Sequence, residues 1–315
     1  MRVAVLTAPR RLDVVDEPAG EPGPGEVLLR VASCGVCASE LDMWEGRSEI
    51  AYPRFPGHEV SGTVERVGAG VAALAPGDPV AAWVTERGFA DYAVVRADYC
   101  FPAGDVPLDL ALAEPLACAV NAVERAAPAL GDDVVIIGAG FMGNLVQLLV
   151  QLKGPRNVIV ADTRLDALER ARRLGATGTV DVRRESLAET VHAVTDEEGA
   201  DVAFEVTGAQ TALTALGDVT RMSGKVVIVG FHQGGDRTLP LGLWNWMAYE
   251  IVNAHFRDVD TIMAGMRTGM RLLTSGRLSL ESLVSHRFEL DDVNDAFAVA
   301  VEKPPGFVKA TVSMG

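Results

Sequence analysis

Residues 134–143 read VVIIGAGFMG, four β-branched residues followed by glycines at 138, 140 and 143. The apolar run predicts a buried strand, the glycines predict a tight turn, and the NLVQLLVQL that follows predicts a helix. Glycine suits such a turn because it permits unusual backbone angles, close approach to a pyrophosphate and tight packing of helix on strand. The helix N-terminus offers N–H groups and the positive end of its dipole to phosphate oxygens.

A second predicted strand, at residues 158–161, ends in Asp162, 19 residues beyond Gly143. A carboxylate there accepts hydrogen bonds from the hydroxyls of an adenosine ribose and repels a 2′-phosphate. Arg164 belongs to the same site, because a cation there could instead accept a 2′-phosphate. An ordinary α/β glycine turn without a ligand stays an alternative. The glycine turn and the strand that ends in Asp162 together predict a dinucleotide site that prefers NAD to NADP. Its expected residues are Gly138, Gly140, Phe141, Met142, Gly143, Asp162 and Arg164.

Length and composition restrict the class of protein. The chain has 315 residues, a formal net charge of −15 and 49% hydrophobic residues, enough for two domains with substantial cores. The acidic balance argues against nucleic acid and anionic membrane as partners. Residues 1–10 lack a secretory pattern, no apolar run reaches transmembrane length, and four cysteines do not form a disulfide framework. We therefore expect a cytoplasmic protein.

Two kinds of pattern follow each other along the chain. The first part predicts short strands at residues 3–6, 12–16, 27–33, 60–67, 79–84 and 89–95, and residues 108–127 predict a helix broken at Pro115. Six strands then follow at residues 134–137, 158–161, 179–182, 202–206, 226–229 and 251–254, mostly separated by helical stretches. The tail predicts helices near 260–274 and 291–301 and strands at 285–288 and 307–312. We expect an α/β fold, a β-rich domain plus a doubly wound parallel sheet of the Rossmann type.

The first part of the chain also holds candidate metal ligands: Cys37, His58, Glu59 and Glu114. Cys37 follows a predicted strand, His58 and Glu59 follow a Pro-Gly turn, and Glu114 lies at the domain junction. One thiolate, one imidazole and carboxylates suit zinc, and a catalytic zinc site keeps one position open for water or substrate. From the residues alone, His58 could also be a hydrogen-bonded polar residue and Cys37 a buried small hydrophobe.

The sequence GHEVSGTVERVGAGV at residues 57–71 resembles the zinc signature of the zinc-dependent medium-chain alcohol dehydrogenases. CGVCAS at residues 34–39 resembles their zinc-ligand turn, in which the second cysteine carries the metal. The glycine turn, Asp162 and the closing segment follow in the family's order, so the resemblance covers nearly the whole chain. It implies a GroES-like catalytic domain at residues 1–118 and 257–315 and a Rossmann NAD-binding domain at residues 119–256.

The resemblance implies a particular ligand set. Zinc ligands are expected at Cys37 and His58, and Glu114 takes the third position, as in the sorbitol (polyol) dehydrogenase branch. Glu59 is expected to bind the ion directly, or transiently as water or substrate exchanges. The four-cysteine lobe that holds a structural zinc is missing, so we expect one zinc per subunit.

Other residues are placed by the same resemblance. Ser39 matches the hydroxyl that touches the substrate oxygen, and Asp42 stands where the family often has a histidine, so it is a candidate proton relay. Lys309 falls where the family often has a base near the pyrophosphate, and Trp44 is a candidate wall of the substrate site. Two histidines follow sheet strands at their carboxyl ends and either line the nicotinamide pocket or are structural: His232 and His255.

These expectations combine into one function. We expect a zinc enzyme that oxidises a secondary alcohol, such as a polyol, cyclitol or sugar, to a ketone and passes a hydride to NAD. One alternative is a zinc-free quinone or enoyl reductase of the same superfamily, although such enzymes lack the Cys–His pair. The other is a dinucleotide-binding protein without catalysis, which would bind NAD without zinc. We expect a homodimer or homotetramer, since these folds commonly pair through the last sheet strand, here residues 251–254.

Overall fold

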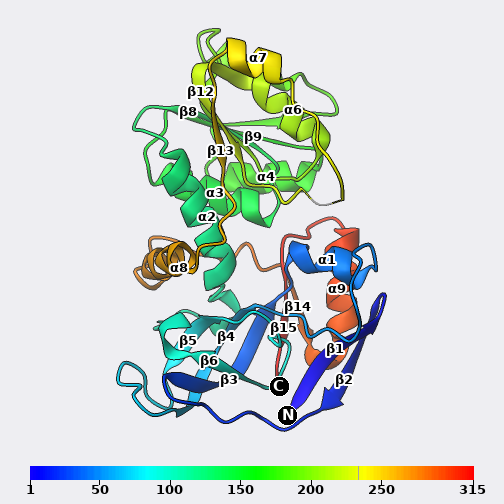
Figure 1. Ribbon diagram of the computed structural model, residues 1–315. Coiled ribbons are helices and arrows are strands. Elements are labelled where there is room, and N and C mark those ends of the chain that lie inside the picture. The colour runs from blue at the N-terminus through cyan, green and yellow to red at the C-terminus, as the bar shows by residue number, and fades with distance from the viewer. Residues whose placement is uncertain (233) are drawn as a thin grey trace. The chain divides into compact units, whose positions relative to one another are not determined.

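The computed structural model describes residues 1–232 and 234–315, which divide into two compact units (Figure 1). The first unit comprises residues 1–117 and 263–315, and the second comprises residues 118–262. The sheets of the first unit are mostly antiparallel, with β14 and β15 paired in parallel, and the sheet of the second unit is parallel, so the predicted fold class is confirmed. Within the described residues, no helix is both long enough and apolar enough to cross a membrane.

The second unit is built on a six-stranded parallel sheet. Its strand order reverses between β8 and β11, and a sheet of this kind binds ligands in the crevice at the carboxyl ends of its strands beside such a switch point. In spatial order the strands are β10 (Gly178–Asp181), β9 (Asn157–Asp162), β8 (Asp133–Ile137), β11 (Ala200–Glu205), β12 (Thr220–Ile228) and β13 (Glu250–Asn253).

Helices cover both faces of this sheet. Gly143, on α3, packs toward Ile136 of β8, whereas Val135 and Ile137 join the core formed with α5 and α6. Burial on both faces explains why β8 is apolar throughout its predicted part rather than alternating. The helices of this unit are α3 (Phe141–Gln151), α4 (Leu165–Arg173), α5 (Leu187–Val194), α6 (Gln210–Val219) and α7 (Leu241–Trp246).

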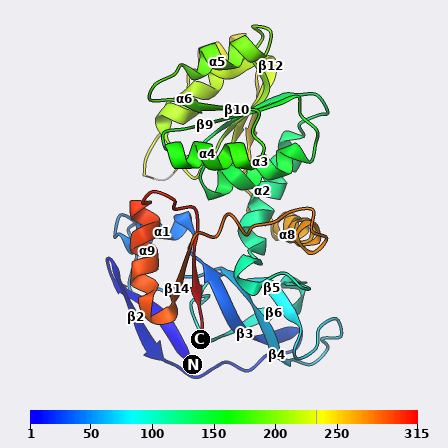
Figure 2. The ribbon, with the colours of Figure 1, turned by 180° about the vertical axis from the view of Figure 1, so that it is seen from behind.

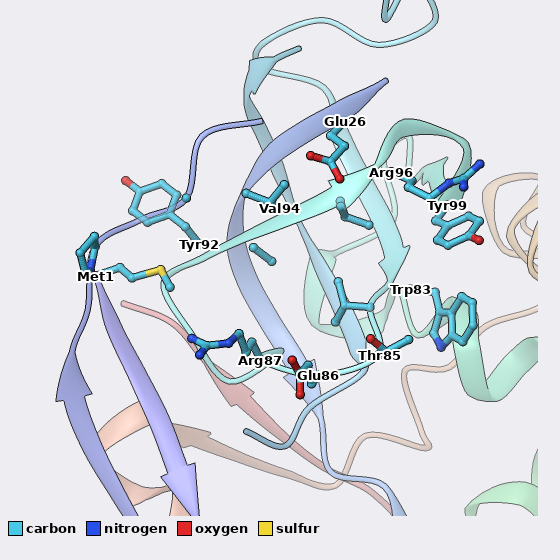
Figure 3. A pocket seen from close by; sticks show the side chains of 15 residues that line it. Met1, Glu26, Trp83, Thr85, Glu86, Arg87, Tyr92, Val94, Arg96 and Tyr99 are labelled. Atoms are coloured by element: carbon cyan, nitrogen blue, oxygen red, sulfur yellow. The ribbon is translucent and has the colours of Figure 1, made fainter. Parts of the chain in front are cut away.

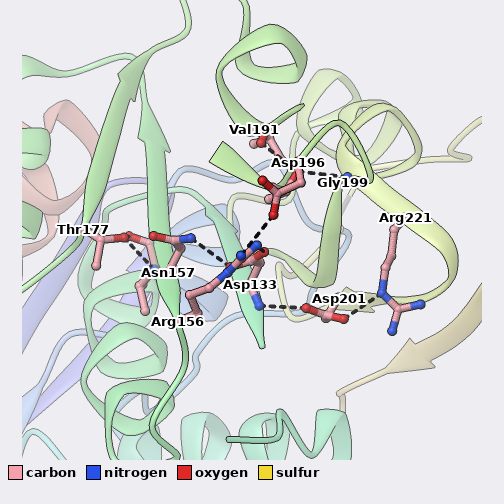
Figure 4. Close-up of polar contacts among 11 residues, drawn as sticks. Asp133, Arg156, Asn157, Thr177, Val191, Asp196, Gly199, Asp201 and Arg221 are labelled. Carbon is pink, nitrogen blue, oxygen red and sulfur yellow. Dashed lines mark hydrogen bonds and ion pairs between the residues drawn. The ribbon is translucent and has the colours of Figure 1, made fainter. Parts of the chain in front are cut away.

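A polar network joins the amino ends of four strands of the parallel sheet, β8, β9, β11 and β12 (Figure 4). Asp133 accepts hydrogen bonds from Arg156 Nε and from Asn157 Nδ2, both at 2.9 Å, and its N–H donates to Asp201 Oδ2 at 2.8 Å. Asp201 in turn accepts from Arg221 Nε at 2.6 Å. Burial works to raise the pKa of Asp133, but the bonds from Arg156 and Asn157 outweigh it and lower that pKa. This edge lies opposite the expected ligand crevice, so the network stabilises the sheet.

The first unit draws on both ends of the chain. The order of its large sheet is β14 (His286–Glu289), β15 (Ala310–Ser313), β3 (Glu26–Gly35), β4 (Glu59–Val67), β5 (Pro79–Trp83) and β7 (Cys100–Pro102), and β6 (Tyr92–Arg96) pairs with β3. Strands β1 (Arg2–Ala8) and β2 (Arg11–Asp16) form a separate hairpin. Helix α9 (Val293–Glu302) lies beside β14 and β15 (Figures 1 and 2), and the remaining helices are α1 (Ala38–Trp44), α8 (Val259–Thr274) and α2 (Ala113–Ala126), the last continuing into the second unit.

Every predicted strand overlaps an observed one, and the predicted helices differ mainly at their ends. The break predicted at Pro115 is wrong. Pro115 lies in the first turn of α2, where a backbone N–H has no intrahelical partner, so proline costs the helix no hydrogen bond. Strand β7 and helices α1 and α7 were not predicted, because each is too short to show a period.

Candidate active site

The pairing of β3 with β4 brings the predicted metal ligands together. The end of β3 lies opposite the start of β4, with Gly35 aligned to Glu59. Cys37 comes two residues after β3 as the residue that precedes α1, and His58 immediately precedes β4. Residues about twenty positions apart in the sequence therefore meet at one edge of the sheet.

A strained turn presents His58. Gly57 has φ +102°, and a Cβ at this position would lie 2.6 Å from the backbone nitrogen of Phe89. Only glycine fits both restrictions without displacing the neighbouring backbone. The glycine of the GHE motif therefore has a local structural reason, which is to turn the chain sharply before the histidine.

The ligand atoms of Cys37, His58 and Glu59 all lie within 4.8 Å of one another. A thiolate, an imidazole and a carboxylate make a donor set that suits zinc, and three protein ligands leave a fourth position open. The residues present therefore fit a catalytic zinc ion. Glu114, at the start of α2, lies just outside this trio, with its Oε2 4.0 Å from His58 Nε2.

Glu40 orients the imidazole. Its Oε1 lies 3.1 Å from His58 Nδ1 and also accepts a hydrogen bond from the N–H of Gly57 at 2.7 Å. This contact directs Nε2 toward the other ligands, which is the usual role of a carboxylate behind a metal-binding histidine. Burial works to lower the pKa of His58, but Glu40 and then Cys37 outweigh it and raise that pKa well above its usual range.

This role of Glu40 was not predicted from the sequence. The available signal was an acidic residue three positions after a candidate ligand, in a segment that forms a helix. The pKa of Glu40 is lowered overall: burial works to raise it, but His58 and the N–H of Gly57 outweigh the effect of burial. The carboxyl group is therefore an anion at neutral pH.

Lys309 lies against Glu59. Its ammonium donates to Glu59 Oε1 and to the carbonyl of Val36, both at 2.8 Å, and lies 2.7 Å from Glu59 Oε2. Both side chains are buried, because β15 pairs with β3 and β3 pairs with β4. A Cβ at Gly35 would overlap the Glu59 carboxylate, so the second residue of CGVC makes room for this pair. The resemblance places Lys309 near the pyrophosphate, and this placement stays a prediction; within the first unit its ammonium contacts Glu59 and Val36.

Three predicted residues lie on α1. The Ser39 hydroxyl donates to Cys37 Sγ at 3.2 Å and is exposed. Asp42 accepts from Arg47 Nε at 2.9 Å, so its carboxylate is engaged in an ion pair. Trp44 is only 3% exposed and packs against Phe297 with ring centroids 5.8 Å apart. The expectation that Trp44 forms a substrate wall is wrong, since this ring belongs to the hydrophobic core.

The predicted dinucleotide residues other than Lys309 lie in the second unit. Asp162 Oδ2 accepts from the N–H of Ala139, inside the glycine turn, at 2.7 Å, and Oδ1 accepts from the N–H of Arg164 at 2.8 Å. A Cβ at Gly143 would overlap the carbonyl oxygen of Gly138, so the helix packs directly on the turn. Gly140 precedes α3, whose first turn is Phe141, Met142 and Gly143.

A separate cavity of about 460 Å³ lies in the first unit (Figure 3). Trp83 and Tyr99 line it with ring centroids 5.4 Å apart, and the guanidinium of Arg96 lies over Tyr99 at 4.8 Å. Among the described residues, none of the candidate metal ligands lines this cavity. The metal cluster is therefore a different site.

Comparison with known proteins identifies the class. Residues 23–105 match the alcohol dehydrogenase GroES-like domain, and residues 142–257 match the zinc-binding dehydrogenase family. Sorbitol dehydrogenase of Gallus gallus is 32% identical, over 91% of this chain and 89% of that protein. L-threonine 3-dehydrogenase of Pyrococcus abyssi is 29% identical, over 90% of each. The crystal structure of galactitol-1-phosphate dehydrogenase from Escherichia coli superposes with a TM-score of 0.86 at 25% identity, over 99% of this chain and 100% of that one.

The chain belongs to the zinc-type medium-chain alcohol dehydrogenase family. It is accordingly an oxidoreductase that acts on CH–OH groups, an alcohol or polyol dehydrogenase whose cofactors are zinc and a nicotinamide dinucleotide. The predicted class, activity and cofactor types are confirmed.

Proposed function

We propose that this enzyme oxidises a secondary alcohol of a polyol, cyclitol or sugar to a ketone, with NAD as hydride acceptor and one zinc per subunit. The observation that carries the proposal is the carboxylate-rich metal cluster. Glu59 lies in the cluster, and Glu114 approaches His58 Nε2 at 4.0 Å. Carboxylate oxygens accept hydrogen bonds from neighbouring hydroxyl groups, so this site suits a substrate with several of them. The 32% identity to a sorbitol dehydrogenase supports the same substrate class.

The cysteines support a single zinc. Burial raises the pKa of Cys34 well above its usual range and that of Cys100 to about 12, so both thiols are protonated at neutral pH. Zinc binds the thiolate form. Among the described residues, Cys37 is also the cysteine that lies in a cluster with other potential metal ligands, His58 and Glu59, so we take it as the sulfur ligand.

The side chains around the cluster have separate tasks. Cys37, His58 and Glu59 would hold the zinc ion, which when bound lowers the pKa of an alcohol hydroxyl. Glu40 keeps His58 Nε2 directed at the ion, and Lys309 neutralises part of the charge on Glu59.

Ser39 Oγ, beside Cys37 Sγ, takes part in removing the substrate's hydroxyl proton in this proposal, as a relay that accepts this proton while it passes its own proton on. Asp42 lies three residues further along α1, on the same side of the helix, and stays our candidate for passing that proton to solvent. Its ion pair with Arg47 is 23% exposed on the carboxylate side, which leaves a path to water.

Asp162→Ala should weaken the preference for NAD over NADP. The ribose hydroxyls lose a charged acceptor, and the 2′-phosphate no longer meets a carboxylate. We expect the ratio of kcat/KM for NAD to that for NADP to fall by about 10- to 100-fold, the size of a hydrogen bond to a charged group. Asp181→Asn is the matched control, because Asp181 is aligned with Asp162 on the neighbouring strand and pairs with Arg183. An unchanged ratio in Asp162→Ala would move the ribose contact elsewhere.

The substrate class is tested with a panel of polyols, cyclitols and sugars beside ethanol and benzyl alcohol. Reduction of NAD is followed by absorbance with the zinc-loaded enzyme. We expect the highest kcat/KM for a compound with vicinal hydroxyl groups. An enzyme faster on ethanol or benzyl alcohol than on every polyol would contradict the proposal.

We also propose a homodimer formed through β13, or a homotetramer made of two such dimers. This strand is the last of the parallel sheet, and within the described chain it pairs only with β12. Ile251 on β13 is 46% exposed and Trp246 on α7 is 78% exposed, and an open sheet edge with exposed apolar side chains favours pairing with a second copy. Sedimentation should give at least twice the 33.3 kDa chain mass. Ile251→Asp should dissociate the assembly, whereas Leu130→Asp, at an exposed site outside this edge, should not. A monomeric wild type would refute the dimer.

A further inference from the structure

Glu205 is a fully buried acid that the metal and ribose sites do not use. It is the last residue of β11, and its Oε1 accepts from the N–H and Oγ1 of Thr207, both at 2.6 Å, and from the N–H of Gly208 at 2.8 Å. Its Oε2 lies 2.9 Å from His232 Nε2. A carboxylate without solvent contact is tolerated in a folded protein only where hydrogen-bond donors compensate for its lost hydration.

His232 completes the arrangement from the loop after β12. Its Nε2 donates to Glu205, and its Nδ1 accepts from Arg237 Nε at 3.2 Å, so the imidazole has a defined tautomer between an anion and a cation. His255, after β13, contacts the same loop through a bond of 3.0 Å between its Nε2 and the carbonyl of Gly230. The carboxyl ends of β11, β12 and β13 are therefore connected by polar side chains.

These loops pack against the glycine turn. A Cβ at Gly138 would lie 2.7 Å from Cγ2 of Thr207, and a Cβ at Gly208 would lie 2.6 Å from the carbonyl oxygen of Phe231. A Cβ at Gly230 would overlap the Glu205 carboxylate. The turn after β8 and the loops after β11 and β12 thus meet without room for a side chain. A displacement of one loop would disturb the other two.

The position of the loops after β11 and β12 in the sheet indicates their role. A doubly wound sheet consists of two mononucleotide-binding halves, and Asp162 marks the half formed by β8, β9 and β10 as the adenosine side. The half formed by β11, β12 and β13 is then left for the nicotinamide nucleotide. We propose that Glu205 and His232 are positioning residues of the cofactor site, which hold the loops 206–208 and 229–232 as the surface that receives the nicotinamide nucleotide. This inference rests on the proposed NAD site.

Asp201 provides a matched comparison. It lies near the amino end of the same strand, in the polar network of Figure 4, and pairs with Arg221 at 2.6 Å. Both acids join neighbouring strands through a basic side chain, but only Glu205 lies at the edge where the cofactor binds. A purely structural role predicts similar consequences for the two acids, whereas a positioning role separates them.

The test measures the dissociation constant of NADH by fluorescence in zinc-loaded variants. Glu205→Gln leaves one hydrogen bond unmade in either tautomer of His232, because an amide N–H replaces an acceptor. We expect Glu205→Gln and His232→Leu to bind NADH at least about tenfold more weakly, a difference of about 1.4 kcal/mol, with zinc content unchanged. His232→Gln retains an N–H donor for Glu205 and should stay within about threefold of wild type. Asp201→Asn should lower Tm without weakening NADH binding.

Steady-state kinetics give a second readout. The KM for NAD should rise in Glu205→Gln and His232→Leu while the KM for the alcohol stays unchanged, a split that a loss of folded enzyme does not produce. If Glu205→Gln does not fold, Thr207→Val removes one donor to the same carboxylate and takes its place.

The possible outcomes distinguish a failure of the positioning role from a failure of the proposed function. The positioning role alone would be overturned if wild type binds NADH and the variants bind it equally well. These variants are His232→Leu and Glu205→Gln, or Thr207→Val in place of the latter. A His232→Gln variant as weak as His232→Leu, or an Asp201→Asn variant as weak as Glu205→Gln, would overturn it as well. Wild type that binds no NADH would overturn the proposed function and this inference with it.

Discussion

Cys37→Ala should abolish zinc binding and nearly all turnover but leave NADH binding nearly intact. The substitution removes the thiolate from a cluster of three ligand atoms, and a histidine with a lysine-paired carboxylate is a poor zinc site. Because the metal supplies the charge that stabilises the reacting oxygen, kcat should fall by about three orders of magnitude or more. Zinc is measured by mass spectrometry after dialysis, turnover by NAD reduction, and cofactor binding by NADH fluorescence.

Cys100→Ala is the control for this prediction. Cys100 is a buried cysteine of the same unit, and its raised pKa keeps it a thiol. This variant should keep one zinc per chain and near wild-type turnover. Turnover that survives in Cys37→Ala would refute the metal mechanism, and wild type with two zinc ions per chain would refute the single site.

The fold was predictable because the information is local. Strand β8 is apolar at residues 134–137, and the turn that follows contains three glycines, so both elements are visible within ten residues of sequence. Short elements gave no such signal. Helix α1 has seven residues, and because the sequence does not predict it, Trp44 is interpreted there as a candidate wall of the substrate site rather than as the side chain that packs α1 against Phe297 of α9.

The metal ligands were predictable for a different reason. Cys37, His58 and Glu59 were found through short motifs whose members are consecutive or nearly so. Their supporting residues depend on strand register, which no local pattern fixes. Lys309 meets Glu59 across 250 residues because β15 pairs with β3, and Glu205 meets His232 only because β11 and β12 end at the same edge.

Lys309→Met should show how much the protein depends on the charge beside Glu59. Both side chains are at most 6% exposed, so removal of the ammonium leaves a buried carboxylate without its cation. Burial works to lower the pKa of Lys309, but Glu59 and Cys37 outweigh it and raise that pKa, so the lost group is a full positive charge at neutral pH. We expect the free energy of unfolding of the zinc-free protein to fall by roughly 3–5 kcal/mol, measured by urea denaturation in the presence of a chelator.

The loss should shrink once zinc is bound, because the ion supplies a positive charge to the same carboxylate. Glu59→Gln combined with Lys309→Met removes both charges and should recover most of the stability of the zinc-free protein, since no buried ion is left unpaired. Lys153→Met is the surface control: its pair with Glu124 is exposed and should contribute at most about 1 kcal/mol. A zinc-free Lys309→Met variant as stable as this control would mean that Glu59 is neutral or hydrated without its lysine. An equal loss with and without zinc would place Glu59 outside the metal's coordination, leaving Cys37, His58 and Glu114 as its ligands.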